Sequence, residues 1–142
     1  MNELYVYASS SDCKELYPTN KVNNFRVNLG ENIVTDEGWY VGLVSVKTPC
    51  INVKGRSEYV SICSPMVIPS MEGGTKVPIL GKVLISGKET HHQFQHVSYF
   101  PVRSRDLSTI QIYIKREGDR ETPTFKTDIS IECTLHFKRR QP

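Results

Sequence analysis

The chain has 142 residues and a formal net charge of +3, which is room for one ordinary globular domain and too little for two. Its 38% hydrophobic and 23% charged residues argue against a disordered chain. Because it contains 14 Val, 11 Ile and 10 Thr but a single alanine, its side chains fit a pleated sheet better than a helix. This composition argues against a helical bundle and against a large α/β domain. We predict one all-β domain over residues 1–142.

Alternation of apolar and polar residues with a period of two, punctuated by turn residues, predicts eight strands. In chain order they cover residues 3–9, 24–29, 39–48, 57–63, 79–86, 97–103, 107–115 and 129–138. The longest irregular stretches between them are 10–23 and 64–78. Eight strands in one small domain imply two sheets packed face to face, and long connections favour an eight-stranded single jelly-roll β-sandwich.

The last two predicted strands alternate most clearly. Ile110, Ile112 and Ile114 are expected to face the core. In the final strand the expected inward residues are Ile129, Ile131, Cys133, Leu135 and Phe137, and the expected outward residues are Ser130, Glu132, Thr134, His136 and Lys138.

Strand 39–48 is apolar on both faces. Trp39, Val41 and Leu43 are predicted to point one way, and Tyr40, Val44 and Val46 the other. Either the second set contacts another subunit, or the stretch 64–78 folds over it. The candidate subunit interface therefore comprises Tyr40, Val44, Val46 and Tyr113. Tyr113 is included because outward tyrosines are typical of interfaces. Tyr5 and Tyr7 are also expected to point outward.

A small basic cluster, Lys138, Arg139 and Arg140, follows the last strand. It is either a solvated tail or a contact to nucleic acid or to an acidic neighbour. Three charges give only a weak, salt-sensitive contact to nucleic acid. The second half of the chain carries 12 Lys and Arg against 8 Asp and Glu, which is milder than a dedicated duplex-DNA binder shows.

We find no motif for catalysis and predict no catalytic, cofactor-binding or metal-binding residue, no small-molecule substrate and no enzyme. His92 and His96 are four residues apart, which brings two imidazoles together only on a helix, so His91, His92 and His96 are expected to lie in a polar loop. No C-x-x-C pair occurs, and reduced core thiols are favoured over disulfides for Cys63 and Cys133. No secretory signal or membrane-spanning stretch is expected.

Several short segments resemble a known family. They are Tyr17-Pro18-x-Asn20, Phe25-x-Val27-x-Leu29, Trp39-x-Val41-Gly42-Leu43-x-x-Val46-x-x-Pro49, Tyr99-Phe100-Pro101-Val102, Ile110-x-Ile112-x-Ile114 and Leu135-His136-Phe137-Lys138-Arg139. Together they resemble the penton-like minor capsid proteins, single jelly rolls of Polinton/Maverick, adintovirus and adomavirus-type DNA viruses. The resemblance covers most of the chain, with little of it in residues 50–95.

The resemblance implies a structural protein of the virion. Five copies would form a homopentamer at each icosahedral vertex, beside a hexon-like double-jelly-roll major capsid protein, with assembly in the host-cell nucleus. The chain lacks the large insertions and the Arg-Gly-Asp that adenovirus-type vertex proteins use to bind receptors. A nucleic-acid-binding β-sandwich or barrel associated with the viral particle is the alternative.

Overall fold

The computed structural model describes residues 3–11, 16–18, 24–32, 38–48, 58–72, 74–86, 90–103, 107–116 and 131–139. These residues form strands joined by turns and loops, and none of them lies in a helix that could cross a membrane. The strands are β1 (Glu3–Ser9), β2 (Asn24–Asn28), β3 (Trp39–Thr48), β4 (Glu58–Cys63), β5 (Ser70–Glu72), β6 (Thr75–Val77), β7 (Ile79–Ile85), β8 (Thr90–Gln93), β9 (Tyr99–Pro101), β10 (Thr109–Arg116) and β11 (Glu132–Arg139).

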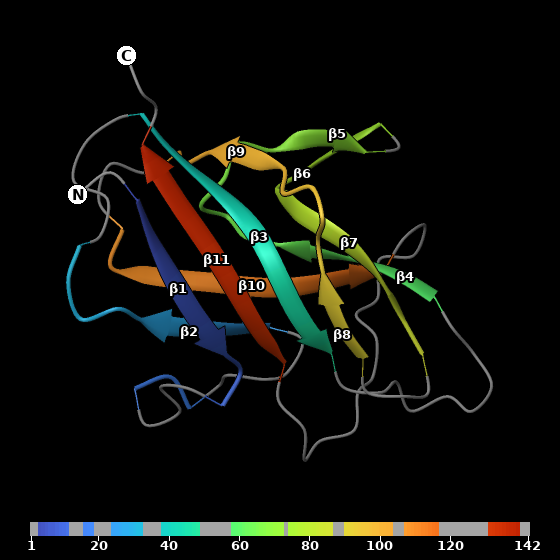
Figure 1. Ribbon diagram of the computed structural model, residues 1–142, viewed down its shortest axis with the longest axis horizontal. Coiled ribbons are helices and arrows are strands. Elements are labelled where there is room, and N and C mark those ends of the chain that lie inside the picture. Colours follow the sequence, from blue (N-terminus) through green and yellow to red (C-terminus); the bar gives the residue numbers. More distant parts are fainter. Residues whose placement is uncertain are drawn as a thin grey trace.

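Two antiparallel sheets form the two layers of a sandwich (Figure 1). Sheet A has the strand order β1-β11-β3-β8, with β9 also paired to β3, and sheet B has the order β2-β10-β4-β7. Strands from the first half of the chain pair with strands from the second half in reverse order: β1 with β11, β2 with β10, β3 with β8 and β9, and β4 with β7. This pairing is that of an antiparallel ribbon rolled into a sandwich, which is the topology of a jelly roll.

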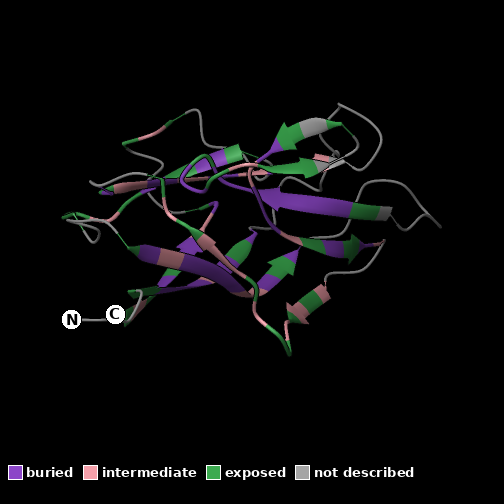
Figure 2. Ribbon diagram, turned by 90° about the horizontal axis from the view of Figure 1, so that it is seen from above, coloured by how far each residue is buried: buried purple, intermediate pink, exposed green. Residues whose placement is uncertain are grey.

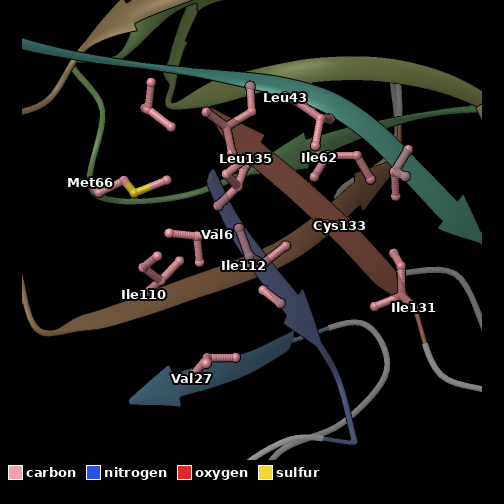
Figure 3. Close-up of a cluster of buried hydrophobic side chains, with 14 of the residues drawn as sticks. Val6, Val27, Leu43, Ile62, Met66, Ile110, Ile112, Ile131, Cys133 and Leu135 are labelled. Carbon is pink, nitrogen blue, oxygen red and sulfur yellow. The ribbon is translucent and has the colours of Figure 1, made fainter. Parts of the chain in front are cut away.

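The core lies between the sheets, where the alternating apolar side chains of both layers meet (Figures 2 and 3). Ile110, Ile112 and Ile114 are fully buried, as predicted, and face Leu135 and Phe137 of the opposite sheet within one cluster. Ile131 and Cys133 are also buried. Ile129 and Ser130 lie outside the described residues. Burying a side chain of this size typically contributes about 1.5–3 kcal/mol, so this cluster is the main source of the fold's stability.

Each of the eight predicted strands overlaps a strand in the described part of the chain, which also contains the short strands β5, β6 and β8. The stretch 64–78, expected to be irregular, contains the β5–β6 hairpin, and the expected polar loop around His91 and His92 contains β8. These strands escaped prediction because β8 is made of polar residues at the sheet edge, and because prolines and glycines hide the alternation around the hairpin.

A β-bulge in β3 corrects the predicted faces of that strand. Thr134 of β11 pairs with Ser45 but the next residue, Leu135, pairs with Leu43, so Val44 is an extra residue in the ladder. A bulge shifts the inward and outward alternation by one residue. Val46 consequently points into the core and is 0% exposed, and its predicted outward orientation beside Tyr40 and Val44 is wrong.

Candidate assembly surface

The outer face of sheet A carries a row of side chains that crosses four strands. Tyr5 of β1 pairs with His136 of β11, His136 pairs with Gly42 of β3, and Gly42 pairs with Tyr99 of β9. Residues in register on neighbouring antiparallel strands point to the same face. The first, last and middle strands of the chain therefore contribute to one site on this face.

His136 lies at the centre of this row and points to the outer face, as predicted, but it is only 7% exposed because the rings of Tyr5 and Tyr99 contact it. The Tyr99 hydroxyl is 2.7 Å from its Nδ1, and a Glu3 carboxylate oxygen is 3.2 Å from its Nε2. A carboxylate only accepts, so Nε2–H donates to Glu3, and in the neutral ring Nδ1 accepts the proton of the Tyr99 hydroxyl. Both ring nitrogens are thus satisfied, which allows the imidazole to be buried.

Aromatic contacts hold the rings around His136 in place. The Tyr5 ring stacks on the imidazole, with centroids 4.4 Å apart and planes inclined by 16°. The Tyr99 ring meets His136 edge-on at 5.7 Å, and the Lys138 ammonium lies 3.7 Å from the centre of the Tyr99 ring. Stacked and cation–π pairs of this kind each contribute roughly 0.5–1.5 kcal/mol. These contacts stabilise the arrangement of the rings around His136.

Gly42 makes room for the cluster. The backbones of Tyr99 and His136 are two strand spacings apart, roughly 9–10 Å, so the tyrosine must lie across β3 to reach the imidazole. A Cβ atom at position 42 would overlap Val97 Cγ1 and lie only 3.0 Å from the Ser98 carbonyl oxygen and 3.1 Å from Tyr99 Cδ1. The missing side chain allows segment 97–99 to cover β3 at this point.

Burial is the main cause of a raised pKa for the Tyr99 phenol, and nearby Tyr5 and Glu3 add to it. Tyr99 therefore stays protonated at neutral pH and acts as a hydrogen-bond donor. Cys133 lies in the core, where burial raises its pKa to about 12, so its thiol stays protonated. Neither Cys63 nor Cys133 forms a disulfide, as predicted for these two. The Tyr99 hydroxyl and the Cys133 thiol therefore both have structural roles, the first as a hydrogen-bond donor to His136 and the second as a buried core side chain.

The predicted interface residues are not brought together. Tyr40 and Val44 are half-buried on or beside the outer face of sheet A, Val46 lies in the core, and Tyr113 lies on the outer face of sheet B. There Tyr113 packs beside Cys63, Val77 and Ile79, and burial, followed by nearby Cys63, raises its pKa. The stretch 64–78 thus contributes Val77 to a cluster on sheet B, and segment 97–99 covers β3 at Gly42.

Of the predicted basic cluster, Lys138 and Arg139 are exposed at the end of β11, and Arg140 lies outside the described residues. His91 and His92 are neighbours on β8 and point to opposite faces of the sheet. Burial, followed by the adjacent His91, lowers the pKa of His92. Among the described side chains, no three from His, Cys, Asp and Glu gather closely enough to hold a metal ion.

Sequence reasoning missed the cluster of Glu3, Tyr5, Tyr99 and His136. The alternation does place Tyr5 and His136 on the outward sides of the first and last strands. A jelly roll pairs its first and last strands, so the predicted fold could have been used to place Tyr5 beside His136. Tyr99 reaches His136 across β3 because position 42 is a glycine, and no pattern in the sequence predicts that contact.

The strand order defines the class of protein as a jelly-roll β-sandwich, which confirms the predicted fold class. Among solved structures, the chain is similar to the crystal structure of selenomethionine-labelled mavirus penton protein. The TM-score is 0.51 over 96% of this chain and 99% of that chain, at 7% sequence identity. At this identity the similarity concerns the fold. No protein-family model and no curated protein matches the chain.

Proposed function

We propose that this chain is a penton-like minor capsid protein that acts by assembly and not by catalysis. Residues 1–142 act as one jelly-roll domain, and five copies form a ring that fills an icosahedral vertex. The observation that carries the proposal is the jelly-roll strand order together with the similarity to mavirus penton protein over 96% of the chain. The family resemblance of the sequence segments supports the same role.

A five-membered ring uses one heterologous contact repeated by rotation, so each copy offers two different patches. A stable contact of this kind buries roughly 1,200–2,000 Å² in total, counting both partners. Each copy takes part in two contacts and so gives up a similar area. The isolated chain exposes 8636 Å², so the ring would cover roughly a seventh to a quarter of its surface. Two large sheet faces supply that area.

The proposal includes a second partner and a location. The ring sits among copies of a hexon-like double-jelly-roll major capsid protein, and the particle assembles in the host-cell nucleus. Immunogold labelling of purified particles with an antibody to this chain tests the location. Label confined to the vertices supports the proposal, and particles without label overturn it.

The purified protein tests the ring. Light scattering during size exclusion, across a range of concentrations, should give a mass of about 81 kDa for five copies of 16.2 kDa. Negative-stain images should show five-fold symmetry. A monomer at every concentration, also when mixed with the major capsid protein, would overturn the ring.

A second candidate function is binding of nucleic acid, supported by the cations on the outer face of sheet B. Arg26 of β2, Lys82 of β7 and Lys115 of β10 occupy outward positions there. Fluorescence anisotropy with a labelled single-stranded oligonucleotide tests it. Affinity that falls steeply with salt supports this function, and equal, negligible binding at low and high salt excludes it.

A further inference from the structure

The short strand β8 is the end of sheet A, and it can open without the rest of the fold. It has four residues, all of them polar, and among the described strands it pairs only with β3 (Figure 1). Just beyond it the Phe94 amide donates to the Val44 carbonyl oxygen at 3.0 Å. Edge segments with few buried apolar contacts are among the least stable parts of a protein. Local opening of β8 therefore costs less than global unfolding.

His92 is the residue of β8 that points toward the core. It pairs with Val46, which is 0% exposed, and paired residues point to the same face of a sheet. Two residues further on, Phe94 reaches β7 of the opposite sheet, where a Cβ atom added to Gly81 would lie 3.3 Å from Phe94 Cζ. His92 therefore lies at the edge of the core, between the two sheets.

The Nε2 atom of His92 is buried and has no hydrogen-bond partner. In the described part of the chain, it is the one buried side-chain nitrogen or oxygen without a partner. A neutral imidazole can leave Nε2 unprotonated, but the charged ring carries a proton on both nitrogens. Protonation would thus create a buried, charged N–H without an acceptor, which is costly. Burial, followed by nearby His91, lowers the pKa of His92 accordingly.

The groups around this imidazole offer no compensating negative charge from β3, β7 or β8. Besides the imidazole itself, the charged or titratable residues of β7, of β8 and of the β3 segment that pairs with β8 are Lys82, His91 and Lys47, and all three point to outer faces. The acidic position on the next strand of sheet B is Glu58, which pairs with Ile85 at the end of β7. Its effect is tested below.

His136 differs from His92 in this respect. Its Nε2–H has an acceptor in Glu3, and its Nδ1 has a partner in the Tyr99 hydroxyl, which can donate or accept. Protonation of His136 leaves neither nitrogen without a partner. Of these two histidines, His92 is therefore the one whose protonation conflicts with its surroundings.

We propose that protonation of His92 releases β8 from β3, so that β8 is an acid-sensitive edge strand. In the open strand, water hydrates the charged ring, whereas the closed strand holds it at the edge of the core. The open state takes up a proton that the closed state does not, so it gains population as the pH falls through about 6.5, the ordinary pKa of histidine. Release leaves this edge of β3 unpaired from Ser45 to Thr48, and an unpaired edge is a template for another strand. The inference concerns a single chain and goes beyond the proposed function.

Hydrogen exchange read by mass spectrometry tests the inference at pH 7.5 and pH 5.5. Between these values a proton taken up only by the open state favours that state by up to about tenfold. Peptides covering residues 90–94 should lose protection by about five- to tenfold, after correction for the intrinsic effect of pH on exchange. The Ser10 amide, which donates to the Ile131 carbonyl oxygen at 3.0 Å, reports on the β1 side of sheet A. Its peptide should change by less than about twofold.

Three variants assign the effect to His92. His92→Leu removes the titrating group and replaces the unpartnered nitrogen by an apolar side chain, so protection of residues 90–94 should become equal at the two pH values. His91→Gln, at the exposed neighbouring position, is the matched control and should keep the acid effect. Glu58→Gln should also keep it. Thermal melts at pH 7.5 check that the variants fold.

Three results would overturn the inference. They are equal corrected protection of residues 90–94 at both pH values in the wild type, an acid effect that persists in His92→Leu, and an equal loss at the Ser10 peptide, which would report global unfolding. The measurement is separate from the test of the ring. A monomer with the acid effect supports the inference while the ring fails, and five-fold rings without the acid effect leave the proposed function intact.

Discussion

Replacing Gly42 by alanine should destabilise the protein, because the added methyl group enters the space that segment 97–99 occupies. The new Cβ would overlap Val97 Cγ1 and crowd the Ser98 carbonyl oxygen at 3.0 Å. Overpacking of this kind typically costs about 1–3 kcal/mol. Displacing Tyr99 would also leave Nδ1 of the buried His136 without a partner, which costs about 1–3 kcal/mol. The two effects overlap, so we expect a loss of about 2–4 kcal/mol.

Gly81→Ala is the matched control, since Gly81 also lies within a strand. A Cβ there would meet only the ends of two side chains, Leu43 Cδ2 and Phe94 Cζ, both at 3.3 Å. Alanine also lowers the entropy of the unfolded chain by about 0.4–1 kcal/mol relative to glycine, which offsets part of that crowding. Gly81→Ala should therefore unfold within about 1 kcal/mol of the wild type.

Urea unfolding followed by circular dichroism measures both variants. With a slope of about 2 kcal/mol/M, the midpoint of Gly42→Ala should fall by about 1–2 M. A long-range ¹H–¹⁵N spectrum of the His136 ring should show the Nε2–H tautomer in the wild type and a loss of that preference in Gly42→Ala. Coincident midpoints for the two glycine variants at equal slope would refute the reasoning about Gly42.

Three further predictions follow from burial. The pKa of Tyr99 is raised, so the folded state keeps a proton that the unfolded chain loses above about pH 10, and stability should fall as the pH rises through that range. In Tyr99→Phe the urea midpoint should fall less steeply with pH than in the wild type. An equal dependence of the two midpoints on pH would contradict this. Val46→Asp should prevent folding, because an unpaired charge in the core costs more than about 4 kcal/mol. Val44→Asp should still unfold cooperatively on heating, because Val44 is the extra residue of the bulge and lies outside the core. Similar thermal melts of the two variants would contradict the bulge. Iodoacetamide should label Cys133 only after denaturation, as read by peptide mass spectrometry, and rapid labelling of the native protein would contradict its burial.

Regular alternation made most of the fold predictable. The isoleucines at 110, 112 and 114 identify a strand and its inward face, because a strand repeats every two residues. The same rule misassigned Val46, because a bulge adds one residue to β3 without a mark in the sequence. β8 was missed for a related reason: its residues are polar, and their strand conformation comes from pairing with β3.

The candidate surface was less predictable than the fold because it is made of long-range pairings. Tyr5 and His136 are 131 positions apart in sequence, and only the jelly-roll order brings them together. Tyr113 and Tyr40 have similar outward positions in their strands, yet they lie on different sheets. A periodic pattern tells which side of its own strand a residue occupies, and it carries no information about which strand comes next to it.

The position of β11 between β1 and β3 has a consequence for synthesis. The ribosome makes Glu3 long before Lys138, its partner across the ladder, and during that interval β1 lacks β11, the strand with which it pairs in sheet A. Closing a loop of that length carries a large entropic cost, and chains dominated by such distant contacts fold slowly. We therefore expect β1, with Tyr5 and Tyr7, to remain without its sheet partner until the residues of β11 have left the exit tunnel.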